Sequence, residues 1–83
     1  MKVTFHSWLK NTIGSNSEEL ILPESVITIS DLAAFLASEH EEAAAVFELP
    51  EALRYVVDRR YVTPEHDLTG VDAIEIYPPI TGG

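Results

Sequence analysis

Segments with the alternating pattern of β-strands stand at both ends of the chain, and a segment with helical periodicity lies between them. Residues 2–9 alternate in polarity, and so do residues 71–77, where Ile74 and Ile76 are expected to point inward. Residues 27–40 instead place their large apolar side chains at the spacing of an amphipathic helix. This order predicts one helix packed against a sheet that contains both ends of the chain.

The other segments predict shorter elements. Residues 18–23 form a second strand that pairs with the first as an antiparallel hairpin, through turn chemistry in residues 10–17. Residues 41–50 indicate one or two further helical turns, which end at Pro50. Residues 52–62 read as two strands, and residues 68–70 as a turn before the last strand.

Two boundaries depend on particular residues. Ser30 is expected to cap the main helix, with Asp31 at a favourable position near its N-terminus. The two strands of the second half meet near Asp58 and Arg59, and this turn lacks the glycine or asparagine that tight hairpins prefer. The sequence therefore does not decide the geometry of this turn.

The predicted fold class is α+β, a ββαβ(β) roll with one main helix on one face of a mixed sheet. The first and last strands can lie side by side and parallel only if the helix crosses between the two halves. The 83 residues suffice for a single domain. We assign residues 1–77 to this domain and residues 78–83 to an extended, flexible C-terminal tail.

Charge and composition exclude several classes of function. Five basic side chains against fourteen acidic ones give a formal charge of −9, so a nucleic-acid partner is not expected. Without cysteine there can be no disulfide, thiolate metal site or cysteine nucleophile. No apolar run approaches a membrane span, and the start does not resemble a signal peptide, so we expect a cytoplasmic protein without a membrane partner.

Side-chain catalysis finds no support in the sequence. His6, His40 and His66 fall on different predicted elements and are interpreted as surface residues, so no metal site is expected. No phosphate-binding loop or nucleophile motif is present. We therefore expect a protein without catalytic side chains of its own and without a bound cofactor.

The last residues carry the most specific signal. Pro78 and Pro79 cannot continue a hydrogen-bonded strand, so the chain should leave the sheet there. Gly82 and Gly83 lack a Cβ, so a narrow channel could admit them and reach the terminal carboxylate. The residues predicted to thread into such a channel are Pro78, Pro79, Ile80, Thr81 and Gly82, with Gly83 as the reacting residue.

The segment "IEIYPPITGG" resembles the closing segment of the ubiquitin-like sulfur carriers, the MoaD/ThiS family, and most closely the small subunits of molybdopterin synthase. "MKVTFHSWLKNTIG" and "EELILPESVITISDLAAFLA" resemble the family's first strand and turn, and its second strand and capped helix. "LRYVVDRRYV" is similar to its central strand pair. The resemblance covers essentially the whole chain and implies a β-grasp fold.

The resemblance also implies a carrier cycle. An E1-like enzyme would use ATP to adenylate the Gly83 carboxylate, and sulfur transfer would convert it to a thiocarboxylate. The large subunit of molybdopterin synthase, in a heterotetramer, would accept the tail and pass the sulfur to cyclic pyranopterin monophosphate. The only covalent group implied is thus sulfur on Gly83, which suits a chain without cysteine.

A docking face for such partners is predicted beside the tail. His6 and Trp8 on the first strand, and Tyr77 on the last, alternate away from the core and would form an aromatic patch. Three other functions remain open: a ThiS-like carrier for thiazole synthesis, a ubiquitin-like modifier joined to lysines through Gly83, and an interaction module with an idle tail.

Overall fold

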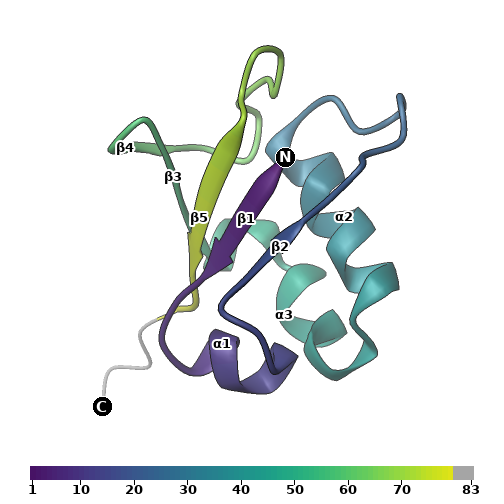
Figure 1. Cartoon of the computed structure of the whole chain (residues 1–83), viewed down its shortest axis with the longest axis vertical. Helices are drawn as coiled ribbons and strands as arrows, with labels where there is room; N and C mark the ends of the chain where they lie inside the picture. Colours follow the sequence, from purple (N-terminus) through teal and green to yellow (C-terminus); the bar gives the residue numbers. More distant parts are fainter. Residues whose placement is uncertain (80–83) are drawn as a thin grey trace.

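A computed structural model describes residues 1–79 as a mixed five-stranded sheet with its helices on one side (Figure 1). The strand order is β2-β1-β5-β3-β4. The strands are β1 (Lys2–Phe5), β2 (Ser17–Glu19), β3 (Arg54–Val57), β4 (Arg60–Val62) and β5 (Ala73–Tyr77). The α-helices are α1 (Trp8–Ile13), α2 (Ile29–Glu39) and α3 (Ala44–Phe47), with 3₁₀ turns η1 (Glu41–Ala43) and η2 (Pro50–Ala52). The predicted α+β roll is confirmed.

The centre of the sheet is the parallel pair of β1 and β5, as predicted from the two alternating ends. Val3 pairs with Ile74 and Phe5 with Ile76, and all four side chains are buried. On its other edge β5 pairs antiparallel with β3, so β5 is held on both sides. Its inward pattern therefore follows the sequence prediction, whereas its first residue is Ala73 rather than residue 71.

Helix α2 covers the inner face and begins earlier than predicted. Thr28, not Ser30, is its N-cap: the Thr28 hydroxyl accepts from the N–H of Asp31 at 3.2 Å, and Asp31 accepts from the N–H of Thr28 at 3.1 Å. Hydrogen bonds from the backbone N–H groups of Ile27 and Thr28 hold the pKa of Asp31 below its usual value. The helix is capped by Thr28 and not by Ser30 because the reciprocal capping box satisfies two backbone N–H donors, whereas a single serine cap satisfies one.

The prediction of a strand through residue 9 is wrong. β1 ends at Phe5, and α1 occupies residues that were assigned to the strand and to a turn. Leu9 is buried against the core, Ile13 packs beside it one helical turn later, and Gly14 closes α1 with a left-handed φ of 87°. Leu9 fits both periods, so alternation over a few residues could not separate strand from helix.

The second strand is shorter than predicted, and a helix rather than a tight turn connects it to the first. β2 contains only Ser17–Glu19, although its antiparallel pairing with β1 is confirmed. Its edge is attached to the helical layer by His40, whose Nε2 lies 2.7 Å from Glu18 and whose Nδ1 lies 3.1 Å from Glu42. His40, interpreted from the sequence as a surface residue, is thus partly buried between β2 and the helical layer.

The second half of the chain follows the sequence closely. The helical turns predicted in residues 41–50 are η1 and α3, although Pro50 begins η2 instead of simply ending a helix. β3 and β4 meet at Asp58 and Arg59, which have φ values of 51° and 67°. Two consecutive positive φ values are typical of a type I′ turn. The turn whose geometry the sequence left undecided is therefore a tight hairpin, built from residues that are unusual at these positions.

Within residues 1–79, no helix has the length and apolar character needed to cross a membrane.

Tyr55 offers a test of core packing. Its side chain is 1% exposed, and its hydroxyl has no hydrogen-bond partner among the described residues. Burial, followed by the charge of Glu51, raises the pKa of Tyr55, so the phenol stays neutral. We expect Tyr55→Phe to raise the free energy of unfolding by about 1 kcal/mol, because it removes an unsatisfied buried group. Urea unfolding would measure this, with exposed Tyr61→Phe as the unchanged control; a loss of stability would show that the hydroxyl has a partner.

Candidate functional site: the tail root and the hollow beside it

The root of the predicted tail is fixed in the sheet. β5 ends at Tyr77. Near this end, the N–H of His6, the residue after β1, donates a hydrogen bond of 3.0 Å to the carbonyl oxygen of Ile76. Pro78 is buried and Pro79 is half-buried, so the chain leaves the domain from a defined point. The predictions for Ile80, Thr81, Gly82 and Gly83 lie outside the described residues.

A hollow of about 360 Å³ lies beside this exit. We call it the tail-root hollow, and its lining consists of Ser7, Trp8, Arg54, Tyr61, Tyr77, Pro78 and Pro79. Three aromatic rings and two proline rings make up most of this set, and one guanidinium supplies the charge. Trp8 is 39% exposed and Tyr61 is 76% exposed, so large apolar groups face outward here. Such side chains commonly anchor protein interfaces.

The three residues predicted to dock partners lie close together but not as the sequence suggested. Trp8 reaches the hollow from the start of α1, not from the first strand, and Tyr77 lines it from the end of β5. His6 lies next to the hollow and stacks on Tyr77 with ring centroids 4.1 Å apart and an interplanar angle of 5°. Its Nε2 is 2.9 Å from Oε1 of Glu75, which fixes the ring over Tyr77.

Besides Ser7, two lining residues were missed by the sequence interpretation. Arg54 was not singled out as a site residue, but it pairs in register with Tyr77 and lines the hollow. Tyr61 lies on β4 opposite Val56 and points its ring toward solvent. The alternation of β3 and β4 could have placed both on the outer face, whereas their proximity to Trp8 depends on α1, which the sequence did not reveal.

Ser7 explains how Trp8 comes to lie there. Its φ of 59° and ψ of −143° fall in a region that residues with a side chain rarely adopt. This conformation turns the chain sharply from β1 into α1, and the Ser7 side chain makes no capping hydrogen bond in return. The strain is thus located at the lining of the hollow.

The chemistry available here is recognition by apolar contact, aromatic stacking and one cation. Among residues 1–79, no group of three histidine or carboxylate side chains is arranged to hold a metal ion. His6, the histidine beside the tail root, is engaged with Glu75 and Tyr77. The described residues at this site therefore offer a surface for recognition.

Comparison with known families decides the identity of this arrangement. The family model described as "ThiS family" matches residues 3–83, nearly the entire chain. The chain belongs to the ThiS family. Its members are small ubiquitin-like sulfur carriers that are not themselves catalytic. The sulfur-carrier resemblance stated from the sequence is therefore confirmed, and the match includes the terminal Gly-Gly pair.

Solved structures agree with this assignment. A protein from Pyrococcus furiosus, provisionally assigned as subunit 1 of molybdopterin converting factor, matches with a TM-score of 0.75 and 26% identity over 95% of each chain. SAMP1 from Haloferax volcanii matches with a TM-score of 0.76 at 17% identity, covering 99% of this chain and 97% of its own. The HVO 2177 protein of the same organism gives 0.74 at 18% identity, covering 99% and 84%. The last two show the β-grasp fold alone. A search of curated proteins found no match.

The backbone of Ser7 yields a prediction for this carrier. Ser7→Gly should raise the free energy of unfolding by about 1 kcal/mol, because glycine adopts this conformation without a steric penalty. Ser7→Ala keeps a Cβ and loses no capping bond, so it should change stability by less than about 0.5 kcal/mol. Urea unfolding of both variants checks this; equal destabilisation by glycine and alanine would contradict a strained Ser7.

Proposed function

We propose that this protein is the sulfur-carrier subunit of a molybdopterin synthase, with Gly83 as the residue that carries sulfur. The observation that carries the proposal is the family match through residue 83. The 26% identity to the molybdopterin converting factor protein favours this branch of the family. The acceptor proposed is cyclic pyranopterin monophosphate, held by a large catalytic subunit in a heterotetramer.

The proposed reaction uses the carboxylate of Gly83. An E1-like enzyme binds ATP, a carboxylate oxygen attacks the α-phosphorus, and pyrophosphate leaves. The sulfur of a sulfide-level donor then attacks the carbonyl carbon, AMP leaves, and a thiocarboxylate remains. Because the chain has no cysteine, none of its own side chains can compete for this sulfur as a thiolate.

The tail root supports delivery of that group. β5 is paired on both edges, and buried Pro78 sets where the chain leaves the domain. The five residues from Pro79 to Gly83 span roughly 16–18 Å when fully extended, enough to enter a partner's active site. Glycine at the last two positions permits close approach of the partner's backbone.

The tail-root hollow is the proposed docking site for the large subunit. Trp8, Tyr61 and Tyr77 would be covered by apolar groups of the partner, and Arg54 would meet a carboxylate or carbonyl. His6 would act as a positioning residue, because it stacks on Tyr77. Docking next to the exit orders the start of the tail and reduces the entropy lost on threading the rest.

Carriage of sulfur to a thiazole synthase is the second candidate, since the matching family model is described by the name ThiS. Both candidates need the same thiocarboxylate and differ only in the acceptor. To distinguish the two candidates, the thiocarboxylated protein is supplied separately to a molybdopterin synthase large subunit and to a thiazole synthase, and the transfer of sulfur to each is measured. A protein modifier would instead be joined to lysine side chains of other proteins, and digestion would then yield branched peptides in which Gly82 and Gly83 are linked to a lysine.

The first prediction for this proposal concerns the terminus. Protein purified from its host without acid should contain a fraction whose mass increase equals exchange of one oxygen for sulfur, located in a C-terminal peptide that ends at Gly83. Incubation with ATP, an E1-like enzyme and a sulfur donor should increase that fraction. A variant extended beyond Gly83 is the matched control, since its Gly83 carbonyl is an amide. Failure of the native protein to gain sulfur in this mixture would refute the proposal.

The second prediction concerns docking. Trp8→Ala and Tyr61→Ala should each weaken binding to the large subunit at least about tenfold, in line with truncation of an aromatic anchor. Leu49→Ala, also an exposed apolar residue but outside the tail-root hollow, should leave affinity unchanged. Isothermal titration calorimetry measures all three. Equal affinities throughout would remove the hollow from the interface while leaving sulfur carriage open.

A further inference from the structure

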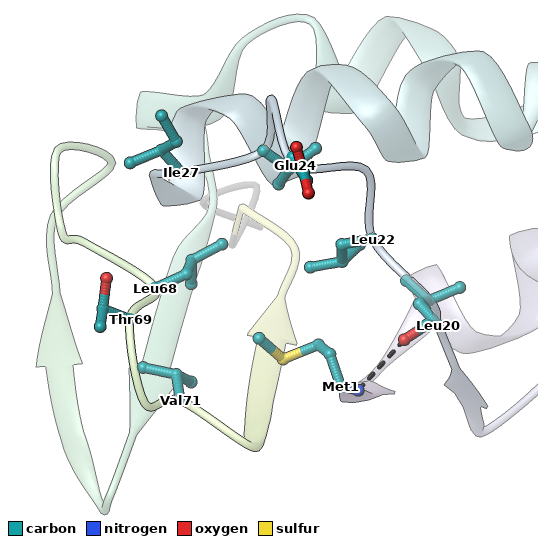
Figure 2. A pocket seen from close by; sticks show the side chains of 9 residues that line it. Met1, Leu20, Leu22, Glu24, Ile27, Leu68, Thr69 and Val71 are labelled. Carbon is teal, nitrogen blue, oxygen red and sulfur yellow. Dashed lines mark hydrogen bonds between the residues drawn. The ribbon is translucent and has the colours of Figure 1, made fainter.

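A second cavity, most of whose lining residues are apolar, lies at the other end of the molecule. It has a volume of about 370 Å³ and is formed by three parts of the chain: Met1 at the N-terminus, the segment that joins β2 to α2, and the loop before β5. Figure 2 shows the side chains of Met1, Leu22 and Leu68 converging on the space between these segments. We call this cavity the Leu22 groove; Val71 borders it on the β5 side.

The most exposed apolar side chain of the described residues adjoins this groove. Ile21 is 98% exposed and stands between Leu20 and Leu22, which both line the groove; Ile27, itself a lining residue, is 54% exposed. The only other large apolar side chains exposed in residues 1–79 are Trp8 and Tyr61 at the tail-root hollow, and Leu49. The fold thus gathers solvent-facing apolar groups in two places, and such clusters mark interaction sites.

The charges around the Leu22 groove are predominantly negative. Glu24 lines it, and exposed Glu19, Asp67 and Asp72 each directly adjoin a lining residue in the chain. Hydrogen bonds from the hydroxyl and then the N–H of Thr69 hold the pKa of Asp67 below its usual value. Two groups of opposite charge lie nearby: the N-terminal ammonium of Met1, whose nitrogen is 3.9 Å from Oε2 of Glu19, and the side chain of Lys2, which follows Met1 in the chain.

Position separates this groove from the tail. Val71 comes just before β5 and Pro78 just after it, and the five residues of β5 span about 16 Å. Figure 1 shows the start of β5 and the loop before α2 at one end of the molecule, and the end of β5 at the other. A partner in the groove therefore leaves the tail-root hollow uncovered.

We propose that the Leu22 groove is a second docking surface, which binds a segment of a partner protein that presents apolar side chains flanked by lysine or arginine. The apolar groups enter between Leu22, Leu68 and Val71, and the cations meet Glu24 and its acidic neighbours. A second copy of this chain is a poor occupant, because it would bring two acidic rims together on molecules of charge −9. The proposal concerns a surface distinct from Gly83 and stands apart from sulfur carriage.

The test uses the full-length protein, labelled with ¹⁵N, and three short synthetic peptides. One contains leucine and lysine, the second replaces lysine by glutamate, and the third replaces leucine by serine. The leucine–lysine peptide should shift the amide resonances of Leu22, Ile27, Leu68 and Val71 while those of Trp8 and Tyr61 stay in place. The glutamate and serine peptides should produce no saturable shift at the groove.

Variants with matched controls test the two parts of the interaction. Glu24→Lys should weaken binding of the leucine–lysine peptide about fivefold more than Glu51→Lys, which makes the same change in net charge at an exposed position outside the groove. Ile27→Ala should weaken it about fivefold more than Leu49→Ala, whose side chain is similarly exposed at 56%.

Three outcomes would overturn the proposal. The first is a saturable shift centred on Trp8 and Tyr61, which would assign basic-apolar segments to the tail-root hollow. The second is binding of the lysine–serine peptide as tight as that of the leucine–lysine peptide, which would indicate attraction to acidic charge alone. The third is concentration-dependent dimerisation that Ile27→Ala abolishes, which would make the groove a self-association surface.

Discussion

The parallel pairing of β1 with β5 is the constraint on which the rest of this structure depends. Two parallel strands cannot be joined by a tight turn, so the chain between them must cross over, and α2 makes that crossing on the inner face. The same pairing places β5 inside the sheet, between β1 and β3. The exit of the tail, the proximity of His6 to Tyr77 and the separation of the two apolar surfaces all follow from this arrangement.

The parts of the fold that sequence predicted are those in which local pattern and tertiary packing agree. Ile74 and Ile76 alternate in a strand that is buried on its inner face only, so their period is unambiguous. The start of α2 was less predictable, because Ser30 and Thr28 are both good caps. The choice between them depends on which one brings Asp31 into a reciprocal bond. The role assigned to Gly82 and Gly83 was inferred from their chemistry alone and stays a prediction, because these residues lie outside the described structure.

The parts of the fold that the sequence did not predict depend on one backbone conformation that the local sequence does not strongly favour. Ser7 at positive φ ends β1 and begins α1, and serine is not a residue from which such a turn is expected. Without α1, Trp8 was assigned to a strand. The hollow that it forms with Tyr61 and Arg54 could then not be foreseen. Pairings between residues distant in the chain, such as Arg54 with Tyr77, become visible only once strand register is known.

The burial of Pro78 at the end of β5 has a mechanical consequence. A partner that grips the chain beyond this point pulls β5 along its own length, while β1 and β3 hold it from both edges. Hydrogen bonds on both edges are then loaded together in shear instead of opening one after another from an end. A pull on the chain beyond Pro78 would therefore be resisted by both strand pairings at once, and the domain would keep its fold under a load that would peel away an edge strand.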